Sequence, residues 1–480
     1  MSNFEVIIGI ENHVELKTNT KMFSPGPVTF GAEPNTQICE IDLGYPGTMP
    51  SVNKEGVRLA LLACNGLNMQ IDNILRFDRK NYFYPDLVKG FQITQQFYPI
   101  GKEGKIEINL DNGEKKVIEI ERLHIEEDTA KQIHKGEFTY LDYNRSGIGL
   151  IEIVSKPVIR SAYEAVEYVN TLREILLFLG ISDVKMNEGS LRCDVNISLR
   201  PYGYEGFGNK VEIKNLNSLN NVKKAIEYEI KRQSDLILAG EVVRQETRRF
   251  DENSQETILM RVKTDAIDYK YFPEPNLHPI QLEKKWIQEV IDNSPELPAL
   301  KRKRYLEEYN LNIEEVNYIL ASLEQTNFFE QTIKLGSNPR KVTNYLMSDI
   351  KALLNKDNIT IEKSNIKPDH IFKIISLMDD GVISSKHVKS IIPIIYEKGL
   401  DVEIIVEEHG LKLINNEDEI LSYLKPIVES NVLLIREQYA NRPERVEKTL
   451  MGQLMKETGG NVNPDKAIEL LNKIIKEIIK

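Results

Sequence analysis

The sequence is poor in cysteine and tryptophan, with three cysteines and one tryptophan among 480 residues. The cysteines Cys39, Cys64 and Cys193 are too few and too scattered for a disulfide framework or for a zinc site made of four thiolates. This usage is typical of proteins from a reducing compartment, and we expect a cytoplasmic location.

Long hydrophobic runs and an excess of positive charge are also absent. No apolar run approaches the roughly 18 residues of a membrane span, and the N-terminus lacks a basic segment followed by a long apolar core. We therefore expect neither export nor membrane contact. Lys and Arg number 62 against 73 Asp and Glu, a formal net charge of -11. No general positive field attracts nucleic acid, so we expect no DNA binding, and any RNA contact must be local.

Two common phosphate-binding motifs are missing as well. The sequence contains neither a GxxxxGK[ST] loop nor a GxGxxG dinucleotide fingerprint. Nucleotide chemistry in this chain must therefore use a metal ion held by carboxylates.

The hydrophobic pattern predicts an α+β protein. Up to about residue 290, short apolar runs of period two alternate with helical stretches at 161–179 and 219–238. The proline-rich segment 294–300 ends this pattern, and amphipathic helices follow. A second break lies at His409 and Gly410. We therefore predict a sheet-rich domain at 1–293, a helical domain at 294–409 and a small helical tail domain at 410–480.

The strand IGIENHVEL carries the first candidate ligands. Side chains alternate across a strand, so Glu11, His13 and Glu15 share one face. Two carboxylates and an imidazole in a row suit Mg²⁺ or Mn²⁺ better than zinc. The alternative is an antiparallel strand with one solvated polar face.

Similar patterns recur in three further strands. Glu152 lies within the apolar GLIEIVS, where a carboxylate is costly unless it is paired or bound to metal. In RLHIEED, strand alternation places Glu126 on the face of His124, while a bulge could bring Glu127 inward instead. In LRCDVNISLR one face carries polar residues and the other apolar ones, which makes Cys193 a core residue. The polar face consists of Arg192, Asp194, Asn196 and Ser198. Together these strands predict one polar sheet surface that holds cations, although plain salt bridges would also satisfy each strand.

Basic and aromatic residues are mixed in FDRKNYFYPD, QETRRFDE and DYKYFPEPN. Such mixtures suit phosphate contacts and stacking on bases or ribose. They suit core packing equally well, and the sequence leaves both interpretations open.

Nine segments, taken in order over nearly the whole chain, resemble the B subunit of the glutamyl/aspartyl-tRNA amidotransferases. They are IGIENHVELKT, FGAEPNTQICEIDLGYPGTMPSVN, FDRKNYFYPD, LDYNRSGIGLIEIVSKP, DVKMNEGSLRCDVNISLRPYG, EIKNLNSL, QETRRFDE, DYKYFPEPN and MGQLMKETGGNVNP. The resemblance implies a heterotrimeric ligase in which this subunit works with an amidase subunit (A) and a small subunit (C). It also implies that the sheet-rich domain is a catalytic cradle for ATP, metal and the acceptor end, and that the tail domain binds tRNA.

The implied reaction converts misacylated Glu-tRNA(Gln), and often Asp-tRNA(Asn), into the amide-charged tRNA. The B subunit phosphorylates the side-chain carboxylate with ATP and Mg²⁺, and ammonia channelled from the amidase subunit then displaces the phosphate. The sequence leaves open which tRNA is served. It also leaves open two other functions, a noncatalytic tRNA-binding scaffold and an unrelated metal-dependent hydrolase.

The resemblance also assigns site residues. Glu11, His13, Glu127 and Glu152 match the family's metal positions. Asp194 joins this set by strand alternation, with Glu126 as a further candidate. We assign Lys80, Glu127 and Glu152 as catalytic, and Arg79, Arg192 and Asn196 as ATP-binding.

The chain departs from the family at a zinc site. Many relatives carry four cysteines there, whereas this chain has Ser24, Gly26 and Asp42 at three of the positions and keeps only Cys39. No zinc is expected. Asn12 and Gly149 also differ from the usual residues, but Asn12 points away from the ligand row.

Overall fold

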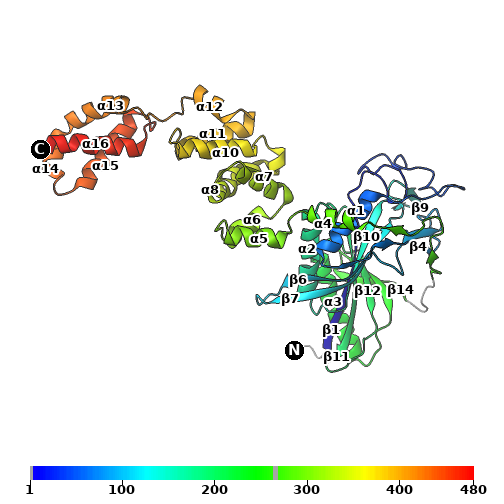
Figure 1. Cartoon of the computed structure of the whole chain (residues 1–480). Coiled ribbons are helices and arrows are strands. Elements are labelled where there is room, and N and C mark those ends of the chain that lie inside the picture. Colours follow the sequence, from blue (N-terminus) through cyan, green and yellow to red (C-terminus); the bar gives the residue numbers. More distant parts are fainter. Residues whose placement is uncertain (1–3, 263–268, 480) are drawn as a thin grey trace. The chain divides into compact units, whose positions relative to one another are not determined.

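The protein is described here from a computed structural model, which covers residues 4–262 and 269–479. The chain forms two compact units, Met1–Pro298 and Ala299–Lys480. Among the described residues all strands lie in the first unit, and the second is helical, so the predicted α+β class is confirmed (Figure 1). Asp268, the first residue of the segment DYKYFPEPN, lies outside the described residues.

The first unit is built on a nine-stranded sheet in the order β14-β13-β12-β11-β1-β10-β7-β6-β2. Its pairings are antiparallel except for the parallel pair β12 and β13. The strands are β1 (Phe4–Glu15), β2 (Gln70–Ile71), β6 (Gly101–Asn109), β7 (Lys115–Glu127), β10 (Gly149–Ser155), β11 (Leu191–Pro201), β12 (Val211–Lys214), β13 (Glu246–Asp251) and β14 (Glu256–Val262). The ligand-bearing strand β1 therefore lies in the middle of the sheet, between β10 and β11.

One face of this sheet is buried under helices. Ile8, Ile10 and Val14 of β1 are fully buried in the core cluster, which also includes residues of the helices α1 (Lys54–Gly66), α2 (Ala162–Phe178) and α3 (Leu219–Leu238). The predicted helices at 161–179 and 219–238 correspond to α2 and α3. Ser161 and Ser218 are their N-caps, each accepting a hydrogen bond from a backbone N–H in the first turn. Because the helices occupy the apolar face, the polar side chains of the strands project from the other.

A small three-stranded sheet borders the end of β7. It pairs β4 (Asp78–Asn81) with β5 (Phe91–Thr94) and β15 (Phe272–Pro273). The backbone N–H of Ile125 in β7 donates to Gln95 Oε1, just beyond β5, at 3.0 Å. This sheet therefore carries the basic and aromatic segment 78–84 to the edge of the polar face. Two small two-stranded sheets complete the unit: β3 (Ile74–Leu75) pairs with the distant β16 (Ile280–Gln281), and β8 (Lys131–Lys135) forms a hairpin with β9 (Phe138–Asp142).

The first unit extends slightly beyond the predicted boundary at residue 293. Helix α4 (Lys284–Asp292) buries Val290 in the core cluster of this unit, and Leu297 also packs against that cluster. The chain leaves the first unit only at Pro298.

The second unit consists of successive helices. They are α5 (Pro298–Glu307), α6 (Ile313–Ile319), α7 (Leu323–Lys334), α8 (Pro339–Tyr345), α9 (Lys351–Asp357), α10 (Pro368–Asp379), α11 (Ser385–Lys398), α12 (Val402–Glu408), α13 (Glu417–Ser430), α14 (Val432–Gln438), α15 (Pro443–Glu457) and α16 (Pro464–Ile479). Residues from Ile420 to Ile475 form a separate hydrophobic core. Residues Ala299–Lys480 form one compact unit. The boundary at residue 409 therefore stays a prediction.

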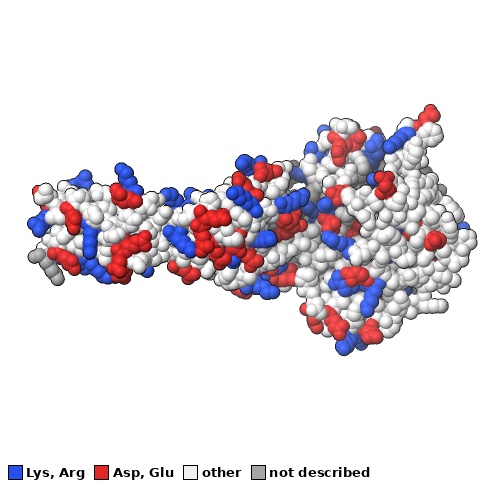
Figure 2. Space-filling model, turned by 90° about the horizontal axis from the view of Figure 1, so that it is seen from above, with Lys and Arg blue, Asp and Glu red and all other residues white. Residues whose placement is uncertain are grey.

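The surface of the second unit mixes both signs of charge. On the face shown in Figure 2, basic and acidic side chains are interspersed over this unit. Among the described residues, we find no helix with the length and apolar character needed to cross a membrane.

Candidate active site

The strand register brings the candidate ligands together on the polar face of the sheet. On one side of β1, His13 is paired with Glu152 of β10; on the other side, Glu11 is paired with Asp194 of β11. Glu152 is in turn paired with His124 of β7. Since paired residues project to the same face, four neighbouring strands contribute to one row of titratable groups.

Two histidines and two carboxylates form the first group, which we call the histidine cluster: His13, His124, Glu126 and Glu152. His13 Nε2 lies 3.4 Å from Glu152 Oε2 and 3.7 Å from Glu126 Oε1. His124 Nε2 lies 3.2 Å from Glu152 Oε2 and 3.5 Å from Glu126 Oε2. Ligand atoms of His13, Glu126 and Glu152 all lie within 4.8 Å of one another, as required of groups that bind one cation.

The pKa shifts in this cluster favour protonated histidines beside ionised carboxylates. Burial opposes protonation of His124, but the carboxylates of Glu152 and Glu126 outweigh it and raise its pKa to about 9. Burial likewise opposes protonation of His13, and the hydrogen bond to Glu152 raises its pKa. Burial works against ionisation of Glu152, yet the two histidines hold its pKa well below the ordinary value. Without a metal ion, protons on the imidazoles therefore balance the carboxylates, and a divalent cation would displace them.

The second group, the acidic cluster, consists of Glu11, Asp194 and Glu212. Their carboxylate oxygens also lie within 4.8 Å of one another. Burial and the neighbouring carboxylates of Glu152 and Asp194 raise the pKa of Glu11. Lys214 Nζ compensates part of this charge, at 2.5 Å from Asp194 and 3.1 Å from Glu212. Glu11 and His13 are two residues apart, ~7 Å along β1, so the two clusters adjoin.

Glu127, which the resemblance assigned as a metal ligand, does not belong to either cluster. Its carboxylate pairs with Lys89 and accepts a hydrogen bond from Ile93 N at 3.0 Å, so it joins β7 to β5. Glu126 takes its place beside His13. The signal was present in the sequence, because strand alternation puts Glu126 on the face of His124 and Glu127 on the opposite face.

Arg79, which we assigned to ATP binding, is engaged with a carboxylate away from both clusters. Its guanidinium forms hydrogen bonds of 2.5 and 3.1 Å with the buried Glu274 carboxylate. It lines a separate small pocket together with Lys89.

Of the three remaining assigned residues, Asn196 and Arg192 lie beside cluster residues, and Lys80 lies beside two tyrosine rings. Asn196 donates a hydrogen bond to Glu11 Oε1 at 2.9 Å. Arg192 is paired in register with His13 and binds Asp128 Oδ2 at 2.5 Å. Lys80 Nζ lies 4.9 Å from the ring centroid of Tyr269 and 5.6 Å from that of Tyr82.

Sequence reasoning did not single out Glu212, Lys214 or Lys89. Glu212 and Lys214 alternate in the strand KVEIKNL, which was recognised as a strand but not as part of the polar row. The pairing of Glu212 with Asn196 shows that β12 continues the same face.

A pocket adjoins the acidic cluster on either side. The Gly9 pocket, of about 450 Å³, is lined by Gly9, Glu11, Ser155, Asn196, Gly208 and Lys210, among others. The Tyr82 pocket, of about 960 Å³, is lined among others by Tyr82, Phe83, Lys214, Thr247, Arg261 and Tyr269. Glu11 lines the first and Lys214, which contacts Asp194 and Glu212, lines the second, so each of these two spaces adjoins the acidic cluster or its lysine partner.

The positions at which relatives carry zinc-binding cysteines hold a buried ion pair instead. Lys21 Nζ lies 3.1 Å from Asp42 Oδ2, and Ser24 Oγ donates to Asp42 Oδ1 at 2.5 Å. The Cys39 backbone N–H also donates to Asp42. A lysine ammonium already balances this carboxylate, so these residues do not fit a zinc ion.

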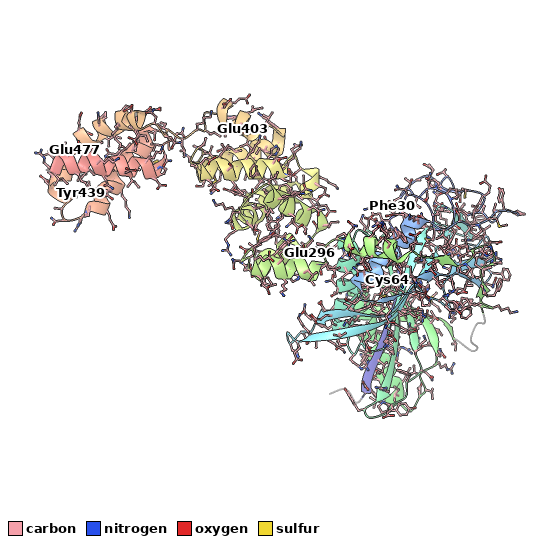
Figure 3. All side chains as sticks on the ribbon, in the orientation of Figure 1. Phe30, Cys64, Glu296, Glu403, Tyr439 and Glu477 are labelled. Carbon is pink, nitrogen blue, oxygen red and sulfur yellow. The ribbon has the colours of Figure 1, made fainter. Side chains whose placement is uncertain are left out.

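The cysteines are not catalytic candidates. Cys193 is buried as predicted, and burial raises the pKa of its thiol. Cys64 on α1 is also fully buried in the first unit (Figure 3).

Comparisons with known proteins show the family of the chain. Residues 6–288 match the family model described as the GatB/GatE catalytic domain, and residues 327–475 match the GatB domain model. A protein of Mycoplasma mycoides, named as the B subunit of an aspartyl/glutamyl-tRNA(Asn/Gln) amidotransferase, is 63% identical over 100% of both chains. Proteins of the same name from Latilactobacillus sakei and Staphylococcus aureus are each 46% identical, over 98% and 99% of both chains. The chain therefore belongs to the GatB family, the B subunits of the aspartyl/glutamyl-tRNA(Asn/Gln) amidotransferases.

Proposed function

We propose that this chain activates the side-chain carboxylate of a misacylated tRNA with Mg²⁺ and ATP, as the B subunit of a cytoplasmic amidotransferase. Its partners would be an amidase subunit (A) and a small subunit (C), and its substrates Glu-tRNA(Gln) and Asp-tRNA(Asn). The main support is the gathering of two clusters suited to cations on one face of the sheet, in a chain similar over its full length to proteins of that name.

The residues of both clusters fit Mg²⁺, which prefers carboxylate oxygens and tolerates an imidazole. His13, Glu126 and Glu152 would hold one ion, and Glu11, Asp194 and Glu212 are suited to a second. Bound there, Mg²⁺ would supply charge neutralisation for the phosphate oxygens during transfer.

The Gly9 pocket is the proposed ATP site. Gly9 and Gly208 both line it, and Gly208 is required by backbone packing, because a Cβ there would lie 2.3 Å from the carbonyl oxygen of Leu199. Lys210 brings positive charge to the pocket, and Asn196 orients Glu11 at its inner end.

The Tyr82 pocket is the proposed site of the aminoacyl end. The acceptor carboxylate and the γ-phosphate would then meet from opposite sides of the acidic cluster, as in-line transfer requires. Lys214, between this pocket and the carboxylates of Asp194 and Glu212, is placed to stabilise the transferring phosphoryl group. Lys80 would orient the acceptor, and Glu127 is a positioning residue that fixes β5 against β7.

The chemistry balances without another co-reactant. A carboxylate oxygen attacks the γ-phosphorus, and ADP leaves with the electrons of the broken P–O bond. Ammonia then attacks the acyl carbon and loses a proton, and inorganic phosphate leaves with the carboxylate oxygen.

Omission and substitution in the reconstituted complex test this proposal. With glutamine and Mg·ATP, conversion of Glu-tRNA(Gln) should require this chain and should be lost with Glu152→Gln, while tRNA binding persists. A noncatalytic scaffold would instead retain conversion in Glu152→Gln. The two clusters disfavour that function, since a scaffold has no need of carboxylates and imidazoles gathered within 4.8 Å of one another.

A further inference from the structure

We infer that Tyr82 and Tyr269, with Lys80 beside both rings, form a stacking platform for the 3′-terminal nucleotide of the acceptor strand. This inference rests on the proposed function, because it specifies how the tRNA end is held in the Tyr82 pocket. It assigns a ligand to aromatic residues whose sequence pattern fitted either stacking or packing.

The two rings form part of a row of aromatic side chains that is only partly buried. The ring centroids of Tyr82 and Tyr269 lie 5.9 Å apart at an interplanar angle of 76°. Tyr269 and Tyr271 follow at 6.0 Å. Tyr82 and Tyr269 are only half-buried and both line the pocket, whereas a core aromatic such as Tyr168 is fully buried. A ring at a pocket wall can receive a base on its open face.

Positive charge accompanies the rings. Lys80 Nζ lies 5.6 Å from the ring centroid of Tyr82 and 4.9 Å from that of Tyr269. Arg261, exposed at the same pocket, can contact the phosphodiester groups that precede the terminal nucleotide. Rings with adjacent cations are the combination by which proteins bind single-stranded nucleic acid regardless of base sequence.

The row lies beside the acidic cluster. Lys214 lines the same pocket as Tyr82 and Tyr269, and its Nζ lies 2.5 Å from Asp194 and 3.1 Å from Glu212. A terminal nucleotide on Tyr82 and Tyr269 would thus hold its ester-linked amino acid next to the acidic cluster.

This placement separates the two nucleotides of the reaction. The Gly9 pocket contains one aromatic residue, Phe207, among its lining residues, and it borders Glu11 rather than Lys214. ATP would occupy that side and the tRNA terminus the other. Stacking tolerates any base, and the platform would therefore serve either misacylated tRNA.

The experiment uses misacylated tRNA whose terminal adenosine is replaced by 2-aminopurine, a base whose fluorescence is quenched by stacking. Binding to the reconstituted complex should quench this fluorescence. In Tyr269→Ala the quenching should be lost, and KM for the misacylated tRNA should rise about tenfold or more, with a smaller change in kcat. Tyr269→Phe retains the ring and should restore the quenching.

Two controls separate stacking from damage to the fold. Tyr163, an exposed tyrosine on α2, is the matched site, and Tyr163→Ala should leave the quenching intact. The Tyr269→Ala complex should keep its Tm and its three subunits. If Tyr269→Ala releases the amidase subunit, the row is a protein interface and the inference is overturned.

The remaining outcomes distinguish this inference from the proposed function. Quenching that persists in both Tyr269→Ala and Tyr82→Ala overturns the platform, even if conversion still depends on Glu152. Conversion that proceeds without this chain overturns the proposed function, and the platform with it.

Discussion

His13 and Glu152 face each other across two antiparallel strands, with His13 Nε2 3.4 Å from Glu152 Oε2. The pair lies in the middle of a nine-stranded sheet, where three helices cover the opposite face and hold both strands in register. The ligand geometry is therefore set by backbone pairing rather than by a mobile loop, which favours a preorganised cation site.

The neighbours Glu126 and Glu127 should differ sharply in metal binding. Glu126→Gln removes a ligand and should weaken Mn²⁺ binding about 10-fold or more, measured by electron paramagnetic resonance titration. Glu127→Gln, a matched change one residue away, should leave Mn²⁺ affinity nearly unchanged, because its carboxylate binds Lys89 and Ile93. Equal losses in the two variants would contradict the assignment.

The metal-free protein should lose stability as the pH rises. The pKa of His124 is about 9 in the folded chain, above its unfolded value of ~6.5. The stabilisation is therefore fully present below pH ~6.5 and is lost as the pH rises through about 9. The free energy of unfolding, measured with urea, should fall as the pH rises between these two values. In His124→Gln it should change less with pH. An unchanged slope in that variant would contradict the raised pKa.

Removing Lys214 should separate cation binding from turnover. Its ammonium lies within 3.1 Å of Asp194 and Glu212. It therefore competes with a bound cation for these two carboxylates. Lys214→Met should therefore tighten or preserve Mn²⁺ binding, while kcat for amidation falls about 100-fold or more. Lys223→Met, at an exposed lysine on α3, is the control. Full activity in Lys214→Met would exclude a role in transfer.

The buried pair of Lys21 and Asp42 should matter for stability rather than for metal. Lys21→Met leaves the Asp42 carboxylate buried without its ammonium partner, which should cost roughly 3–5 kcal/mol of unfolding free energy. Chemical denaturation measures this change. Added zinc should not restore stability in the variant, and restoration by zinc would mean that the site still accepts the metal.

Strand alternation predicted much of the site, because it depends only on local geometry. It placed Glu11 with His13, Asp194 with Asn196, and Glu126 with His124 on shared faces. The family resemblance supplied the function and assigned Glu127 as a metal ligand, whereas the register of β7 puts Glu126 beside the histidines. The two choices differ by one residue, which reverses the face of a strand.

Long-range partners could not be predicted in this way. Arg79 pairs with Glu274, 195 residues away, and no local pattern marks that contact. The place of Glu212 beside Asp194 depends on the pairing of β11 with β12, which follows from tertiary packing rather than from either strand alone. The first compact unit ends a few residues beyond the predicted boundary at 293, and Leu297, in the proline-rich segment, packs against its core.

The fate of the carboxylate oxygen tests the central claim most directly. Glu-tRNA(Gln) carrying oxygen-18 in the glutamate side chain would be amidated by the reconstituted complex with Mg·ATP and glutamine. The account predicts one oxygen-18 atom in the inorganic phosphate released per amide formed, and none above background with Glu152→Gln. Amidation that leaves the phosphate unlabelled would contradict activation of the carboxylate by phosphorylation.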